Sequence, residues 1–199
     1  MYMNVEEINQ LCKETHDLFV EAYPDADERN ISKYTEILGR DIQTINLVLL
    51  GVKPMGIIEP STYEHIPTDR ILLLQDHPQN IRIFSKMSNL VYYLEYEHSD
   101  ANNWMELQGV HLGYPPMVCA EFQKRMSDGT GLLTDDKFEV NYHGLTFIAY
   151  TSLWSDTVDW LKENVNIPAK YQTGIVIESM KTREVKKVGS IEEMYKAVE

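Results

Sequence analysis

The sequence predicts an α+β fold, and three patterns along the chain support this class. Apolar residues recur at helical spacing over the first fifty residues. The stretch GVHLGYPPMVCAEF has the glycine and prolines of a corner between two helices. The final third holds strand-like runs in pairs and a last helix start. We therefore expect a helical N-terminal part, a helix-turn-helix corner at 109–122, and β-hairpins with a final helix in the C-terminal third.

Two helices are expected at the N-terminus. Asn4 followed by Glu7 is the pattern of a capping box, and apolar residues then recur at steps of three and four. A second helix start at Asp25 precedes a longer apolar stripe. Gly51 follows this stripe in the position where a glycine usually ends a helix. The pattern thus predicts two consecutive helices, the second one longer.

The middle of the chain gives weaker signals. VKPMGIIEPSTYEHIP is interrupted by three prolines and indicates a short strand followed by a loop. TDRILLLQDHP fits a short helix or a buried strand, because periodicity does not separate the two. NIRIFSKMSNLVYYLEYE is rich in β-branched and aromatic residues, so we expect strands with a turn at Ser88 and Asn89.

The corner at 109–122 has a simple physical explanation. Gly113 can adopt the left-handed conformation that closes one helix, and Pro115 and Pro116 suit the first turn of the next. The second helix places Cys119 in an apolar stripe, where a thiol usually packs as a small hydrophobic group. We therefore expect Cys119 to be a packing residue and not a nucleophile.

The C-terminal third predicts hairpins and short helices. KFEVNYHGLTFIAYT fits a hairpin that turns at His143 and Gly144. SDTVDWLKENV fits a helix capped by Ser155, and GIVIE and REVKKV fit two further strands. Ser190 and Glu193 form the pattern of a capping box for a final helix. No linker or repeat divides the chain, so we expect one domain over residues 1–199.

Charge and composition exclude several classes of partner. The net charge is −13, and residues 1–50 carry ten acidic side chains against four basic ones. Such a surface repels phosphate backbones, so we expect no direct binding to nucleic acid. No apolar run is long enough to cross a membrane, and the first residues lack the pattern of a signal peptide. With two cysteines and no disulfide framework, these features predict a cytoplasmic protein that does not engage membranes.

LGYPPMVCAEF resembles a motif in a family of small archaeal and bacterial proteins, a domain of unknown function in which LGYP precedes a cysteine pair. NLVLLGVKPMGII is similar to the family segment in which a helix runs into a Gly-x-Lys-Pro turn and a strand. Here Met117 and Val118 stand where the family has its cysteine pair. The resemblance implies a shared fold, and it transfers no thiolate metal or redox site to this chain.

Sequence motifs for known chemistry are absent. The chain has no phosphate-binding loop, dinucleotide fingerprint, nucleophile elbow or paired-cysteine zinc spacing. The polar residues that could line a ligand site near the Gly113–Pro116 corner are His111, Tyr114, His98, Glu97 and Ser152. We expect no cofactor and no metal, with the carboxylates and histidine of EYEHSD as the one alternative for a metal site.

Two functions from different classes remain open at this stage. The first is a non-enzymatic domain that binds a protein partner, a second copy or a ligand, through the tyrosine-rich middle or the acidic N-terminal helices. The second is a metal- or small-molecule-dependent enzyme with its site near the Gly113–Pro116 corner. A third and weaker hypothesis is that the acidic helices mimic nucleic acid and bind a basic protein.

Overall fold

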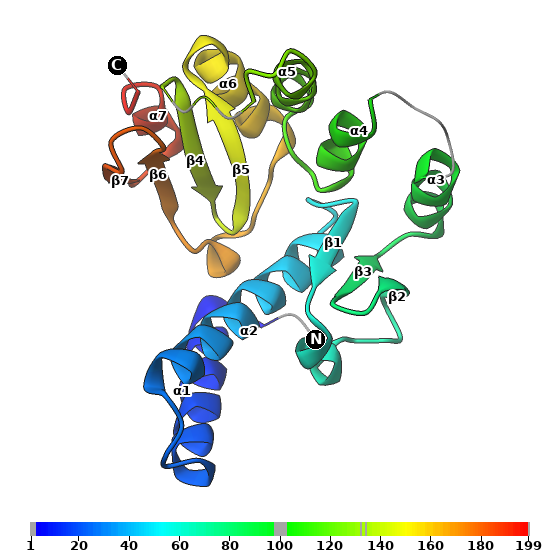
Figure 1. Cartoon of the computed structure of the whole chain (residues 1–199), viewed down its shortest axis with the longest axis vertical. Coiled ribbons are helices and arrows are strands. Elements are labelled where there is room, and N and C mark those ends of the chain that lie inside the picture. The colour runs from blue at the N-terminus through cyan, green and yellow to red at the C-terminus, as the bar shows by residue number, and fades with distance from the viewer. Residues whose placement is uncertain (1–2, 98–102, 132, 134, 199) are drawn as a thin grey trace.

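The computed structural model describes residues 3–97, 103–131, 133 and 135–198. Its first elements are two long helices, α1 (Val5–Ala22) and α2 (Glu28–Leu49), which lie side by side and project from the rest of the molecule (Figure 1). Ile8 packs between the helices against Leu38 and Ile42. The two predicted N-terminal helices are therefore confirmed.

Side-chain caps fix where these helices begin. Asn4 accepts a hydrogen bond from the N–H of Glu7, and the Glu7 carboxylate accepts one from the N–H of Asn4, so the predicted capping box is present. The second helix is capped by Asp27 and not by Asp25, because the Asp27 carboxylate accepts a hydrogen bond from the N–H of Arg29.

A three-stranded antiparallel sheet follows, with strand order β1-β3-β2. Its strands are β1 (Met55–Ile58), β2 (Leu72–His77) and β3 (Asn80–Phe84), and a 3-10 helix, Pro60–His65, lies between β1 and β2. The sheet packs on α2 through a cluster of apolar side chains: Ile45, Val48, Ile58, Ile81 and Ile83. The segment that fitted either a helix or a strand is thus a strand, β2.

The strands expected after residue 85, with a turn at Ser88 and Asn89, are wrong. This segment is the helix α3 (Met87–Glu97). The reason lies in packing: Tyr93 is 1% exposed and stacks at a tilt on Phe84, with ring centroids 5.7 Å apart. A helix brings the apolar residues around Tyr93 onto one face, and this burial outweighs the β propensity of the segment.

Two helices form the predicted corner. They are α4 (Trp104–His111) and α5 (Pro116–Ser127), and the chain turns between them at Gly113. At its other end α5 is tied to the chain that enters the second sheet, because Arg125 donates two hydrogen bonds to the Asp136 carboxylate, at 2.8 and 2.7 Å.

The second sheet is also antiparallel, with strand order β5-β4-β6-β7. Its strands are β4 (Lys137–Tyr142), β5 (Leu145–Tyr150), β6 (Ile175–Ser179) and β7 (Val185–Val188). All four strands lie in segments where strands are expected from the sequence. The strands β5 and β7 form the two edges of the sheet, and this position matters for the site described below.

The hairpin between β4 and β5 turns where the sequence predicts. His143 and Gly144 both have positive φ, 52° and 93°, as the two central residues of a type I′ turn require. The side chain of Gln43 on α2 donates hydrogen bonds to the carbonyl oxygens of His143 and Tyr171, each at 3.0 Å. The turn is therefore attached to the N-terminal helices.

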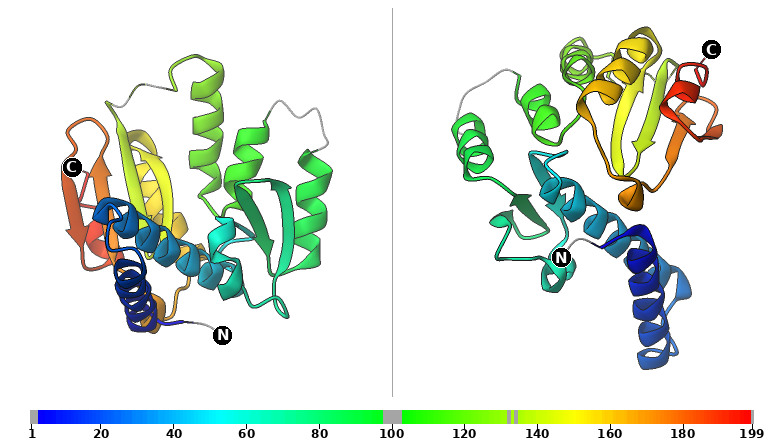
Figure 2. Two further views of the ribbon diagram at one scale, coloured as in Figure 1. Left: turned by 60° about the horizontal axis from the view of Figure 1, so that its bottom comes forward. Right: turned by 180° about the vertical axis from the view of Figure 1, so that it is seen from behind.

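Helices α6 (Trp154–Asn164) and α7 (Ile191–Met194) lie on one side of the second sheet (Figure 2). Short 3-10 turns at Thr151–Leu153 and Ala169–Tyr171 precede α6 and β6. The inner face of the sheet and these helices share a large apolar core, which includes Val140, Phe147, Ile177, Val158, Leu161 and Met194.

One of the two predicted caps in this region is wrong. Ser155 lies inside α6, and Leu153 occupies the N-cap position, because the preceding 3-10 turn runs directly into the helix. Ser190 is a true cap: its hydroxyl accepts a hydrogen bond from the N–H of Glu193. Within the described part of the chain, no helix is long and apolar enough to span a membrane.

Candidate functional site

The corner between α4 and α5 is fixed by its backbone. Gly113 has φ +80°, and its N–H donates to the carbonyl of Val110. The N–H of Tyr114 donates to the carbonyl of Gly109. These bonds close α4, and Pro115 then directs the chain into α5, as the sequence predicts.

Gly113 brings together two segments that are far apart in sequence. A β-carbon at Gly113 would lie 2.9 Å from the carbonyl oxygen of Val52 and 3.2 Å from the Cα of Lys53. The LGYPP corner therefore rests directly on the turn that follows α2. Only a residue without a side chain allows this approach.

A second glycine sets the distance between α4 and α5. A β-carbon at Gly109 would lie 2.6 Å from the sulfur of Cys119, so α5 packs against bare backbone at this point. Cys119 is 4% exposed, which confirms that it packs in the apolar stripe. Gly109 and Cys119 are thus complementary in size.

This complementarity predicts a coupled pair of substitutions. We expect Gly109→Ala to lower the free energy of unfolding by about 1–3 kcal/mol, because the added methyl group overlaps the Cys119 sulfur. In Gly109→Ala/Cys119→Ala the sulfur is gone, so the double variant should regain about 1 kcal/mol relative to the sum of the single variants. Urea denaturation of the four proteins measures this coupling, and purely additive costs would contradict the packing.

A cavity of about 510 Å³ lies between this corner and the second sheet. Most of its wall is apolar and comes from α4, α5 and β5, including Trp104, Leu112, Val118, Phe122, Met126 and Ile148. Polar atoms enter the wall from Gln108, Tyr114, Glu139 and Thr146. A concave, mostly apolar space with a few polar groups is the usual form of a small-molecule site.

The ionisable groups of this wall are mostly neutral at physiological pH. Burial raises the pKa of the Cys119 thiol to about 12, and the Glu106 carboxylate adds to this effect. Burial likewise raises the pKa of the Tyr114 hydroxyl to about 12. Glu139 is an exposed carboxylate on β4. The wall therefore offers hydrogen-bond donors and one exposed negative charge, but no thiolate nucleophile.

Lys53 lies behind the corner and is buried, with 6% of its surface exposed. Its ammonium group is 6.0 Å from the centre of the Tyr114 ring, and no described residue provides a hydrogen bond or ion pair for it. The pKa of Lys53 is lowered to about 8, mainly by burial and also by the nearby charge of Arg40, while Asp41 opposes the shift. The charged form of Lys53 is therefore destabilised in the folded protein.

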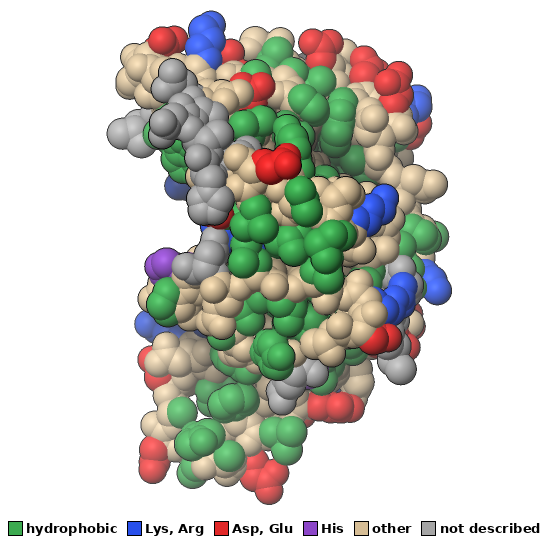
Figure 3. All heavy atoms as spheres, turned by 90° about the vertical axis from the view of Figure 1, so that its right-hand side faces the viewer, with side chains coloured by type: hydrophobic (Ala, Val, Ile, Leu, Met, Phe, Trp, Pro, Cys, Tyr) green, Lys and Arg blue, Asp and Glu red, His purple; other side chains and the backbone are tan. Residues whose placement is uncertain are grey.

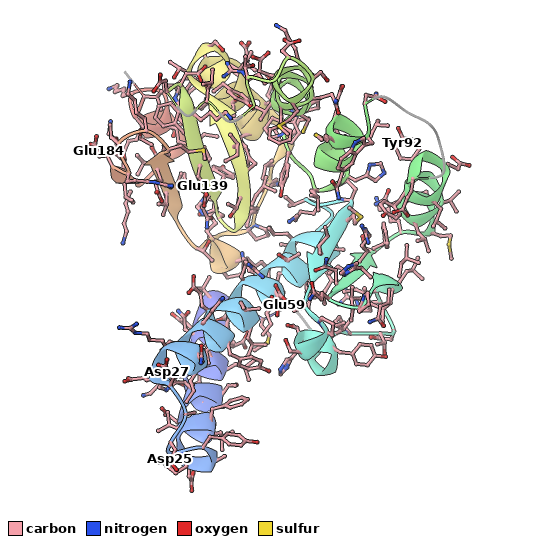
Figure 4. All side chains as sticks on the ribbon, viewed as in Figure 1. Asp25, Asp27, Glu59, Tyr92, Glu139 and Glu184 are labelled. Carbon is pink, nitrogen blue, oxygen red and sulfur yellow. The ribbon has the colours of Figure 1, made fainter. Side chains whose placement is uncertain are left out.

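Tyr114 is the predicted site residue that lines the cavity, and His111 lies elsewhere. His111 is 3% exposed, its Nδ1–H donates to the carbonyl of Leu107 at 2.9 Å, and its ring stacks on Tyr92 at 4.8 Å. Figure 4 shows Tyr92 on the side of α3 that faces α4. Burial lowers the pKa of His111, which keeps the ring neutral. These contacts join α4 to α3.

The remaining predicted site residues are spread over the molecule. The Glu97 carboxylate accepts a hydrogen bond from the Tyr93 hydroxyl at 2.6 Å, on α3. Ser152 is exposed in the 3-10 turn before α6. His98 lies outside the described residues, as do the other two residues of EYEHSD that follow Glu97. No cluster of three potential metal ligands occurs among the residues that the structure describes.

A smaller cavity of about 320 Å³ adjoins the first one. It lies between α1, α2 and the β4–β5 hairpin, and its walls include Asn9, Glu36, Gly144 and Thr146. Thr146 lines both cavities, so both border the same residue of β5. Sequence analysis missed Glu139 and Thr146, although the alternation of the predicted hairpin already placed both on the face opposite Phe147.

An apolar surface lies over α3 and the start of α4, and Trp104 belongs both to it and to the cavity wall. Met87, Val91, Tyr92 and Trp104 are each between 44% and 58% exposed. Figure 3 shows apolar side chains gathered across the middle of the face on which α3 lies, with acidic side chains mainly towards the top and bottom. The cavity is the better-defined site, because residues of α4, α5 and β5 surround it on several sides.

Comparison with known proteins adds no family to this description. No protein-family model matches the chain, and no curated protein or solved structure matches it either. The site must therefore be interpreted from its own geometry.

Proposed function

We propose that the protein is a non-enzymatic binding domain and that it holds a small, largely apolar ligand in the cavity beneath the Gly113–Pro116 corner. The observation that carries this proposal is the cavity of about 510 Å³ between α4, α5 and β5. Its volume falls within the range of roughly 300–1,000 Å³ that small-molecule sites occupy. The apolar wall supplies binding energy, and Gln108, Tyr114 and Glu139 supply orientation.

The chemistry of the wall supports binding more than catalysis. Two ionisable groups that line it, the buried Cys119 and the partly buried Tyr114, keep their protons at neutral pH. A general base needs a pKa near the working pH, and a nucleophilic cysteine needs a lowered one. Neither group meets its requirement, whereas both are suitable for packing against a ligand or donating a hydrogen bond to it.

A neutral fluorescent probe tests this function. We expect N-phenyl-1-naphthylamine to bind at one equivalent with a dissociation constant in the micromolar range, roughly −8 kcal/mol. Ile148→Trp should weaken binding at least tenfold, because Ile148 lines the cavity and the indole would fill it. Fluorescence titration and circular dichroism measure binding and folding in the same samples.

Val176→Trp is the matched control for this experiment. Val176 is also a partly buried β-branched residue in a strand of the second sheet, but it lines neither cavity. Its substitution should leave the affinity for the probe unchanged. Equal weakening by both substitutions, or a stoichiometry above one, would mean that the probe binds the surface and that the cavity is not the site.

A further inference from the structure

The strand β5 has one edge without a partner strand, because it is the terminal strand of its sheet. The N–H of Thr151 donates to the carbonyl of Asp136 at 3.0 Å, and these two residues continue the β4–β5 register. Hydrogen-bonded pairs alternate along an antiparallel ladder. The alternation directs the N–H and C=O groups of Thr146 and Ile148 away from β4, towards the free edge.

No partner for these outward groups lies within the described part of the chain. The larger cavity is located at the same edge, because three consecutive residues of β5, numbers 146–148, line it. Successive side chains of a strand point to opposite faces, so a space that touches all three borders the edge of the strand. The unpaired main-chain groups and the apolar cavity therefore adjoin each other.

The free edge runs the whole length of β5. The smaller cavity lies over the outer face of the sheet and not along this edge, because Asn141 of β4 lines it together with Thr146. From residue 145 to residue 149 the strand spans about 13 Å, at about 3.3 Å per residue. An extended segment of four or five residues has this length.

Charge limits what can occupy the edge. Glu139 is the charged side chain in the wall of the larger cavity, and Glu106 is near enough to raise the pKa of Cys119. Glu139 lies directly opposite Ile148 in the ladder, so it is on the same face of the sheet. A lysine or arginine of an added strand reaches Glu139 across Ile148. The chain's net charge of −13 also attracts a basic occupant.

We propose that β5 binds an extended peptide as an additional strand, with a large apolar side chain in the cavity and a lysine or arginine directed at Glu139. The proposal rests on the proposed function, since it names the ligand of the same cavity as a peptide segment of a partner protein. Main-chain hydrogen bonds to Thr146 and Ile148 supply affinity, and the cavity and Glu139 supply selectivity.

The test uses a blocked peptide, Lys-Thr-Phe-Thr-Leu-Thr-Lys, whose odd residues share one face when extended. We expect it to bind, and we expect the analogue with glutamate at both ends to bind more weakly. Two further analogues are N-methylated, one on the amides of the odd residues and the other on the amides of the even residues. Only one of them should lose binding, because only one set of amides faces β5 in an added strand.

Thr146→Pro removes one outward N–H of β5 and leaves the ladder to β4 intact. It should weaken binding of the peptide about fivefold to tenfold, as the loss of one hydrogen bond predicts. Lys187→Pro is the matched control. The N–H of Ser179 donates to the carbonyl of Glu184, and hydrogen-bonded pairs alternate along the β6–β7 ladder. The N–H of Lys187 therefore points away from β6, to the opposite edge of the sheet from the larger cavity. This variant should bind as the wild type does.

A charge pair completes the test. Glu139→Lys should weaken the basic peptide about fivefold and strengthen the glutamate analogue. Glu184→Lys makes the same change of charge just before β7, and Figure 4 shows Glu184 on the far side of the sheet from α5. This variant should change the affinity for neither peptide. In hydrogen exchange, the amides of Thr146 and Ile148 should become protected when the peptide is bound.

The outcomes separate this inference from the proposed function. If the naphthylamine probe binds and Ile148→Trp blocks it, but no peptide binds, the cavity is a small-molecule site and the strand addition is refuted. Equal effects of the two N-methylated analogues would also refute strand addition, even with tight binding. If neither probe nor peptide binds, the proposed function fails together with the inference.

Discussion

Lys53→Met should make the protein more stable at pH 7, by up to about 3 kcal/mol. The Lys53 side chain is buried, and its pKa falls from the ordinary 10.5 to about 8. A difference of that size corresponds to roughly 3 kcal/mol of cost for the charged form in the folded protein. Methionine has a similar length and no charge, so it removes this cost and keeps the packing against Gly113 and Tyr114.

The pH dependence has a definite sign. Below pH 8 the lysine is charged in both the folded and the unfolded chain, and the folded chain bears the full cost. Between about pH 8 and 10.5 the folded chain loses the proton first, so the unfolded chain binds more protons and stability rises with pH. The advantage of Lys53→Met should therefore shrink as the pH rises above 8.

Urea denaturation of both proteins from pH 6.5 to 9.5 measures this effect. Cys119 and Tyr114, whose pKa values burial raises to about 12 in the folded protein, are shared by both chains, so their contributions cancel in the difference. Lys124→Met, at an exposed position on α5, is the control and should show no such trend. A stability difference that stays constant over this pH range would mean that Lys53 is paired or reaches water.

Local signals in the sequence were sufficient for most of the fold. The caps at Asn4 and Ser190, the positive-φ turn at His143 and Gly144, and the glycine–proline corner each depend on a few neighbouring residues. Such local signals can be interpreted from the sequence because they do not depend on contacts with distant residues. They place nearly every helix and strand correctly among the described residues.

The errors arose where distant contacts decide the structure. Residues 87–97 have the composition of a strand, but the burial of Tyr93 against Phe84 makes them a helix. His111 was expected near a ligand because it is polar and close to the corner. Its actual environment is set by Tyr92 on another helix, which the local sequence does not reveal.

Only the part of the candidate site that depends on local sequence could be predicted. The corner, Tyr114 and the apolar stripe of Cys119 follow from helix geometry and appear in the cavity wall. Glu139 and Thr146 enter that wall only because the edge of β5 faces α4 and α5 across the fold. An edge strand can be recognised in a sequence only once the strand order is known, and here β5 and β6 are consecutive in the chain but are separated by β4 in the sheet.

Gly113→Ala should destabilise the protein more than any other glycine-to-alanine substitution in the corner. We expect it to lower the free energy of unfolding by about 2–4 kcal/mol. Two costs combine at this position. A φ of +80° costs a residue with a side chain about 1–2 kcal/mol. The β-carbon would also lie 2.9 Å from the carbonyl oxygen of Val52, and backbone atoms cannot rotate away as a side chain does.

Gly129→Ala separates the two costs. Gly129 also follows a helix and has φ +72°, but a β-carbon there would meet nothing within 4 Å. Its substitution should cost only the backbone part, about 1–2 kcal/mol. The additional loss of stability in Gly113→Ala then measures the contact between the LGYPP corner and the turn after α2.

Because this contact positions Tyr114 in the cavity wall, Gly113→Ala should also weaken binding of the naphthylamine probe, while Gly129→Ala should not. Equal losses of stability in the two variants would show that the corner is not pressed against Val52 and Lys53 in solution.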